Sequence, residues 1–297
     1  MSINPPHAER AIMFANGLLR LALFGYAVGL LGLVWQRMGT STGSYLFMHH
    51  SIPPASVALG ERVVSGGLFL LIAVALCRPH VVLLLPVVVI VFLEALCGYV
   101  LGGHHFSEWT IAAHVMRYLT PAALILLIIT RKWGWFSMSR VVATAWLLRL
   151  GLACLFITHG LEAYRLHPGF IDLIIGSAEN LLAYRVTESQ AKIMLRTIGM
   201  VDFIVALGVL LYPARPVLAW LMVWGLVTAL SRTTAFGFNH WHEVLLRTGH
   251  FLGPLVLWQL TVAINRRQNE TRDVAINSRQ NETREELGAE RSAFPQI

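Results

Sequence analysis

The chain has 297 residues, of which 56% are hydrophobic and 13% are charged, and its formal net charge is +7. This apolar fraction, with a mean hydropathy of +0.62, excludes a soluble domain because such a domain could not cover its apolar surface. The basic residues stand in short turns between apolar spans, which argues against a nucleic-acid partner and for a lipid bilayer.

Eight apolar stretches follow one another along the chain, and a run of about 20 apolar residues is typical of a transmembrane helix. The sequence therefore predicts an all-α fold, a polytopic membrane helical bundle of about eight transmembrane helices. The second and sixth stretches are short, so seven or nine spans remain alternatives. The expected spans are 13–35, 60–77, 81–103, 109–130, 141–161, 197–212, 217–235 and 244–264.

The turns between these spans favour one orientation. With the N-terminus in the cytoplasm, Arg10, Arg78, Arg140 and Arg215 fall on the inner side, as the positive-inside rule expects. The loop 162–196 keeps four basic residues outside, which weakens the argument. We expect a multi-pass protein of the cell inner (plasma) membrane with both termini cytoplasmic.

The second half of the chain repeats features of the first. Leu-Leu-Arg-Leu at 18–21 recurs at 147–150, and Arg-Pro at 78–79 recurs at 215–216. Because each half then holds four spans, an even number, both halves enter the membrane in the same direction. We therefore expect two parallel four-helix repeats, with any site near their shared interface. The two units are residues 1–135 and 136–262.

Residues 263–297 have a different composition. The twelve residues that begin at Ala263 recur from Ala275 with nine of twelve identical, and most of the segment is polar or charged. Such a segment cannot bury enough apolar surface to fold alone. We expect a disordered tail or a frayed helix, without chemistry.

Each half places histidines and a glutamate before its fourth span, then an arginine and a histidine three residues apart within it. Charged groups inside a membrane are costly and mark functional sites. In the first half they are His104, His105, Glu108, His114 and Arg117. In the second half they are His240, His242, Glu243, Arg247 and His250.

Three chemistries fit these clusters, and none has decisive spacing. Imidazole with a carboxylate suits zinc, copper or iron, which makes a metal site from the two His-rich turns one alternative. Axial ligation of haem by His114 and His250 is another. Histidine also titrates near neutral pH and could exchange protons with a quinone. Structural hydrogen bonding is the competing interpretation.

Further charged residues within the apolar spans are candidate site residues. Arg20 and Arg149 stand at the same depth of equivalent spans, and either packs helices or anchors an anion, a carboxylate or a quinone carbonyl. Glu94 and Asp202 are the candidate partners, and an Arg149–Asp202 pair is the first contact that we expect.

The stretch 147–163 carries Arg149 early in its span and His159-Gly160 ten residues later. This pattern resembles the first helix of the DoxX-like membrane protein family, and 198–208 resembles that family's second helix. The resemblance covers roughly 145–260. It departs from the family near Ala163, because family members usually have a lysine shortly after the His-Gly pair.

The resemblance implies a four-helix membrane module, with the first half as a diverged copy. Relatives in that family include the membrane subunit of thiosulfate:quinone oxidoreductase, and others act in assembly. The resemblance therefore implies a role in a redox function for Arg149 and His159 and, more loosely, for Asp202.

These observations favour a quinone-linked redox membrane subunit with its site near the extracytoplasmic face. We expect a redox or periplasmic protein as its partner. Proton exchange is assigned to His159, His114 and His250. Ligand binding is assigned to Arg149, Arg117, Arg247, Arg20, Glu94 and Asp202. One alternative is a non-catalytic assembly or partner-binding protein. A proton- or metal-coupled transporter ranks third, because we expect no Gly/Pro interruption at matching positions of the two halves.

Overall fold

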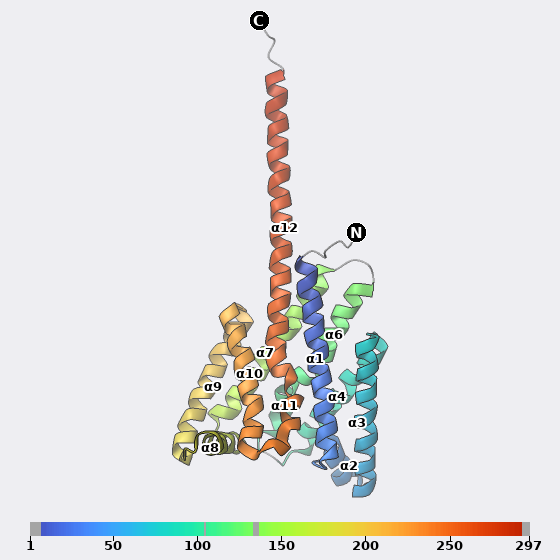
Figure 1. The fold of residues 1–297 in the computed structure, drawn as a ribbon, viewed down its shortest axis with the longest axis vertical. Coiled ribbons are helices and arrows are strands. Elements are labelled where there is room, and N and C mark those ends of the chain that lie inside the picture. The colour runs from blue at the N-terminus through green and yellow to red at the C-terminus, as the bar shows by residue number, and fades with distance from the viewer. Residues whose placement is uncertain (1–6, 104, 133–136, 293–297) are drawn as a thin grey trace.

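The computed structural model describes residues 7–103, 105–132 and 137–292, and every regular element in those ranges is helical (Figure 1). The expected boundary at 135/136 lies outside the described residues. The first half contains α1 (His7–Trp35), α2 (Ser41–His50), α3 (Pro54–Cys77), α4 (Val81–Leu101), the 3-10 turn η1 (Ser107–Trp109), α5 (Thr110–Ala113) and α6 (Val115–Lys132). The second half contains α7 (Met138–Tyr164), α8 (Pro168–Leu182), α9 (Glu188–Leu211), α10 (Arg215–Phe236), η2 (Phe238–His240), α11 (Trp241–Leu246) and α12 (Thr248–Ser292).

Seven helical segments in the described part of the chain are long and apolar enough to cross a membrane, which makes this a multi-pass membrane protein. They are Ala8–Trp35, Pro54–Cys77, Val81–Leu101, Ser107–Ile129, Met138–Tyr164, Glu188–Leu211 and Arg215–Phe236. The expected eighth span, 244–264, falls mainly on the start of α12. This part of α12 packs against α1, α7 and α10. It carries His250, Pro254 and Gln259, and it is therefore less apolar than the seven segments above.

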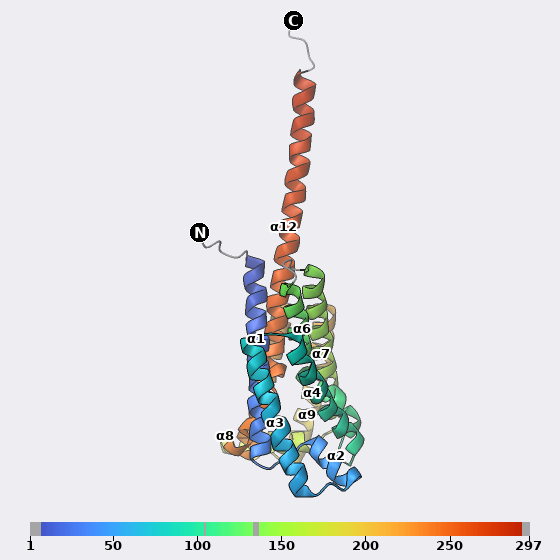
Figure 2. The same ribbon diagram turned by 90° about the vertical axis from the view of Figure 1, so that its right-hand side faces the viewer.

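The same succession of elements occurs in both halves, from α1 to α6 and from α7 to α12. The halves are joined by α1, which packs on α11 and α12, and by α6, which packs on α7 and α12. The short helices α2 and α8 lie on opposite sides of the bundle, at the end away from the tail (Figure 1). At the other end α1 begins and α12 leaves the bundle, and α12 continues as a helix to Ser292 (Figure 2).

Glycines allow two close helix crossings that shape the second half. A Cβ atom on Gly199 of α9 would lie 2.7 Å from the carbonyl oxygen of Gly160 on α7. A Cβ atom on Gly225 of α10 would lie 2.8 Å from the carbonyl oxygen of His250 on α12. Small residues let membrane helices approach in this way. Here they bring α9 close to α7, and α12 close to α10.

Arg20 and Arg149 bond to backbone carbonyls at helix ends. Arg20 donates from Nη1 to the carbonyl oxygen of Leu76, over 3.0 Å, near the end of α3. Arg149 donates to the carbonyl oxygens of the last three residues of α9, over 2.7 to 3.0 Å. The final carbonyls of a helix lack partners within the helix and carry its negative dipole end, so they attract a cation. The expected Arg149–Asp202 pair is therefore wrong.

Glu94 also has a structural partner. Its carboxylate accepts from the backbone N–H groups of Ser41 and Thr42, over 2.6 and 3.0 Å, at the start of α2. Glu61 accepts from the backbone N–H of Thr40 over 2.6 Å. Both carboxylates line a cavity of about 370 Å³ enclosed by the first half. Glu94 thus anchors α2, and it is not the partner of Arg20 or Arg149 that the sequence suggested.

Two prolines contradict another expectation. Pro121 lies inside α6 and Pro254 lies inside α12. Pro121 comes four residues after Arg117, and Pro254 comes four residues after His250. The expectation that no span is interrupted at matching positions is therefore wrong.

Candidate functional site

The pairs His114/Arg117 and Arg247/His250 begin at matching breaks in the fourth span of each half. His114 ends α5 and Arg247 ends α11, with φ of −98° and −103° respectively. The backbone N–H of Arg117 donates to the carbonyl of His114, and that of His250 donates to the carbonyl of Arg247, both over 2.9 Å. The breaks turn both pairs toward the middle of the bundle.

All four of these residues line one cavity between the two halves, which we call the polar chamber. Its volume is about 440 Å³, and His105, His159, Glu162 and His167 also line it. Five residues of the expected site, His114, Arg117, His159, Arg247 and His250, lie around this cavity, and their function stays a prediction.

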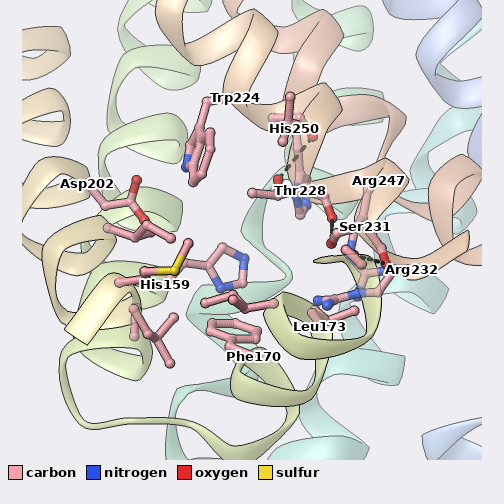
Figure 3. Close-up of a pocket in the computed structure, with 18 of the residues that line it drawn as sticks. His159, Phe170, Leu173, Asp202, Trp224, Thr228, Ser231, Arg232, Arg247 and His250 are labelled. Carbon is pink, nitrogen blue, oxygen red and sulfur yellow. Dashed lines mark hydrogen bonds between the residues drawn. The ribbon is translucent and has the colours of Figure 1, made fainter. Parts of the chain in front are cut away.

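A second cavity, which we call the apolar cavity, lies within the second half and has a volume of about 360 Å³ (Figure 3). Leu, Ile, Met and Phe side chains from α7, α8 and α9 supply most of its wall. The two cavities share five lining residues, namely His159, Phe170, Arg232, Arg247 and His250. The shared residues place a polar rim on an otherwise apolar space.

Hydrogen bonds from α8 close the apolar cavity on one side. Asn180 donates from Nδ2 to the carbonyl oxygens of Thr234 and Ala235, over 2.9 and 3.0 Å, and Ser177 Oγ lies 2.8 Å from Thr234 Oγ1. These contacts occupy carbonyls at the end of α10 that no helical N–H can reach. They hold α8 across the bundle, so that Phe170 faces the cavity (Figure 3).

His159 stands at the centre of this arrangement. Its Nδ1 lies 2.8 Å from Oε2 of Glu162, one turn later on α7, and Glu162 is buried. The centroid of the His159 ring lies 6.0 Å from that of His250 and 5.8 Å from that of Phe170. The carboxylate therefore fixes the Nδ1 side of the ring, and Nε2 is the nitrogen left for a ligand.

His250 is 5% exposed, and within the described part of the chain its Nε2 has no hydrogen-bond partner. A buried polar atom without a partner costs free energy, so it calls for an explanation. The close crossing at Gly225 holds the His250 backbone against α10. A ligand atom in the cavity would supply the missing partner.

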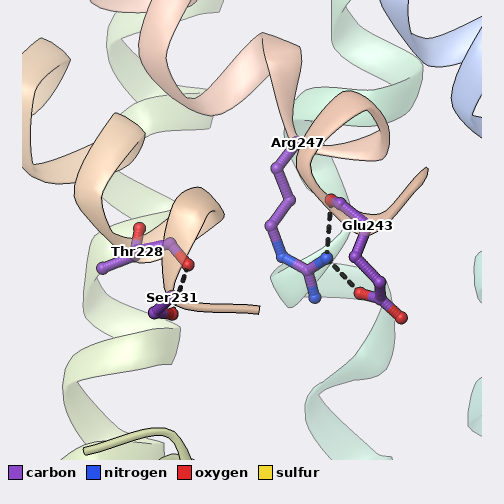
Figure 4. A network of polar contacts seen from close by, with 4 residues as sticks. All are labelled: Thr228, Ser231, Glu243 and Arg247. Carbon is purple, nitrogen blue, oxygen red and sulfur yellow. Dashed lines mark hydrogen bonds and ion pairs between the residues drawn. The ribbon is translucent and has the colours of Figure 1, made fainter. Parts of the chain in front are cut away.

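Three arginines surround the polar rim. Arg247 pairs with the carboxylate of Glu243 and also donates to its carbonyl oxygen over 2.9 Å (Figure 4). Burial raises the pKa of Glu243, but the guanidinium of Arg247 outweighs this and the pKa falls to about 2. Arg232 makes no hydrogen bond or ion pair with a described residue, and its Cζ lies 5.7 Å from the centroid of Phe170. Arg117 lines the polar chamber but not the apolar cavity.

Asp202 is a buried polar group that lines the apolar cavity. It is 4% exposed, and its Oδ1 has no hydrogen-bond partner among the described residues. Asp202 and Trp224 lie on one side of the His159 ring, whereas His250 and Arg232 lie on the other (Figure 3). The cavity therefore offers polar groups at two separated places.

The expected metal residues do not come together in this way. No three His, Cys, Asp or Glu side chains in the described ranges form a group that could hold a metal ion. Glu108 accepts from Trp109 Nε1 over 3.0 Å, and the rings of His240 and His242 lie 5.9 Å apart. His105 faces His167, with ring centroids 6.4 Å apart. His104 lies outside the described residues.

The site differs from the expected one in its arginines and carboxylates. Arg149 lines a cavity at the opposite end of the bundle, and Glu94 lines the cavity of the first half. Sequence reasoning missed Arg232, although it lies within the expected span 217–235, where a buried charge is itself a signal. It also gave no role to Glu162, whose spacing of three residues from His159 on a helix predicts contact.

No protein-family model, no curated protein and no solved structure matches this chain. The resemblance to the DoxX-like family stays a prediction.

Proposed function

We propose that this multi-pass membrane protein binds a quinone in the apolar cavity and acts as a quinone-linked redox subunit. One observation carries the proposal: a polar rim of histidine and arginine opens into an apolar cavity of about 360 Å³. Pockets of this kind suit a ligand with a polar head and an apolar tail. A quinone with an isoprenoid tail is such a ligand.

The placement of the polar groups supports a head with two opposite oxygen atoms. Arg232 and His250 can donate to one quinone oxygen. Asp202, when protonated, can donate to the other oxygen on the far side of His159. Among the described residues, Nε2 of His250 and Oδ1 of Asp202 have no hydrogen-bond partner. The apolar wall between α8 and α9 would then hold the tail.

The polar chamber supports proton exchange with that head. Reduction of a quinone to a quinol adds two electrons and two protons. His159 can pass a proton through Nε2, and Glu162 stabilises the positive ring at Nδ1. The chamber leads from this pair to His167, which is partly buried, and to His105, which is exposed. The electrons would come from a redox protein docked at the same face.

The proposal includes a topology and an ancestry. We infer that α12 makes the eighth crossing, because α1 begins and α12 leaves the bundle at the same end (Figure 1). The two halves would be parallel four-helix repeats of DoxX-like type. Both termini would then be cytoplasmic, and the site would lie near the outer face of the inner membrane.

Extraction of the purified protein with organic solvent tests the proposal. We expect a quinone at close to one equivalent per chain. The Arg232→Gln variant should retain at least ten-fold less, whereas Arg196→Gln, at an exposed position of α9, should retain as much as the wild type. A wild-type extract without quinone, in a preparation that also fails to bind added ubiquinone, would refute the proposal.

One observation favours transport as a second candidate. The breaks at His114 and Arg247, with Pro121 and Pro254 beyond them, interrupt matching helices of both halves, as in many transporters. Uptake of labelled organic anions or metal ions into proteoliposomes, driven by a proton gradient, would favour this candidate. Quinone binding without uptake would favour the redox role.

A further inference from the structure

A large cavity lies at the opposite end of the bundle, where α12 leaves it. Its volume is about 870 Å³, and it lies between α7, the turn from α9 to α10, and α12. The lining residues include Arg149, Arg215 and Arg266, and none of the described residues that line it is acidic. Three cations around one space repel one another, so an anion within it would be stabilised.

The surroundings are those of a membrane interface. Trp146 and Tyr212 line the cavity and are 45% and 76% exposed. Tryptophan and tyrosine concentrate at the level of lipid headgroups. The guanidinium of Arg149 lies 4.1 Å from the centroid of the Trp146 ring, which fixes both side chains at this wall.

The cavity combines this charge with hydrogen-bond donors and an apolar floor. Asn265, Gln268 and Asn269 of α12 supply amide groups to its wall, and Leu218 and Leu257 supply apolar surface. Beside the cavity, the exposed faces of α7 and α9 are apolar, for example at Leu150 (54% exposed) and Leu211 (70% exposed). Phosphate oxygens would meet the donors, and acyl chains would follow these helices.

We propose that this cavity binds the headgroup of an anionic glycerophospholipid. Basic pockets between transmembrane helices are typical sites for such headgroups. The proposal does not depend on the quinone site, because the two cavities share no lining residue.

Thermal unfolding of the full chain in detergent, with added lipid, tests the proposal. Phosphatidylglycerol should raise the melting temperature of the wild type by several degrees more than phosphatidylcholine does, because a ligand that binds only the folded state stabilises it. In the double variant Arg215→Gln/Arg266→Gln, at least half of this difference should disappear. Arg215→Lys, which keeps the charge, should retain most of it.

Arg78→Gln is the matched control, because Arg78 precedes a proline as Arg215 does but does not line this cavity. The control should respond to phosphatidylglycerol as the wild type does. Equal shifts in the wild type and the double variant would overturn the proposal. An equal shift with glycerol phosphate, which lacks acyl chains, would overturn the assignment to a lipid.

Discussion

Nδ1 of His159 lies 2.8 Å from Oε2 of Glu162, and this contact aims the other ring nitrogen at the boundary between the two cavities. A buried carboxylate in this position fixes the orientation and the tautomer of the ring. The pair is the part of the site most suited to moving a proton.

The Glu162→Gln variant should therefore exchange protons more slowly while it still binds the ligand. We expect quinol oxidation or quinone reduction with the redox partner to slow by about ten-fold or more, because a positioned acid–base group contributes at least that much. Quinone affinity should change by less than about three-fold, since the amide keeps a hydrogen bond to the ring. Glu179→Gln, at an exposed site on α8, is the control. Equal rates in both variants would contradict the role of Glu162.

The close crossing of α7 and α9 predicts a sharp effect of one methyl group. In Gly199→Ala the new Cβ would lie 2.7 Å from the carbonyl oxygen of Gly160, so the helices must separate. We expect a loss of about 1–3 kcal/mol in unfolding free energy, as is usual for overpacking. In Gly67→Ala on α3, where nothing lies within 4 Å, the change should be neutral or stabilising by about 0.5–1 kcal/mol. Thermal unfolding in detergent compares the two.

Arg149→Gln separates a helix cap from a ligand anchor. The substitution leaves carbonyl oxygens at the end of α9 without their donors, and we expect a loss of about 1–3 kcal/mol in stability. Arg149→Lys should recover only part, because one ammonium cannot reproduce the planar guanidinium. Quinone retention per folded molecule should be unchanged. A variant of full stability that has lost quinone would show that Arg149 anchors the ligand after all.

The ion pair between Glu243 and Arg247 predicts a response to acid. The pKa of Glu243 falls from 4.5 to about 2, so the folded state favours the charged carboxylate. Its contribution to stability is complete above pH 4.5 and disappears as the pH falls toward 2. Melting temperatures at pH 7, 4.5 and 3 should show this loss in the wild type. Glu243→Gln should be less stable at pH 7 and should lose less on acidification.

The sequence predicts the helical membrane class well, because long apolar runs have few other uses. It also predicts that the pairs His114/Arg117 and Arg247/His250 lie on one side of the membrane, since their spacing recurs at equivalent points of both halves. It does not predict that they line one cavity.

The partners of the buried charges could not be predicted in the same way. Arg149 and Glu94 bond to backbone groups at the ends of distant helices. Every helix end offers such groups, so residue types alone do not select the partner. Arg232 belongs to the site because α8 and α10 cross there, and only the fold brings Phe170 beneath it.

The two halves also differ in the hydrogen-bonding groups that their cavities offer to a ligand. In the first half, Glu61 and Glu94 are committed to the start of α2, so the space of about 370 Å³ beside them has its acidic groups already engaged. In the second half, beside a space of similar size, Nε2 of His250 and Oδ1 of Asp202 have no hydrogen-bond partner among the described residues. The chain should thus have a binding stoichiometry of one: a quinone titration should saturate at a single molar equivalent, with a hyperbolic isotherm and no cooperativity within a chain.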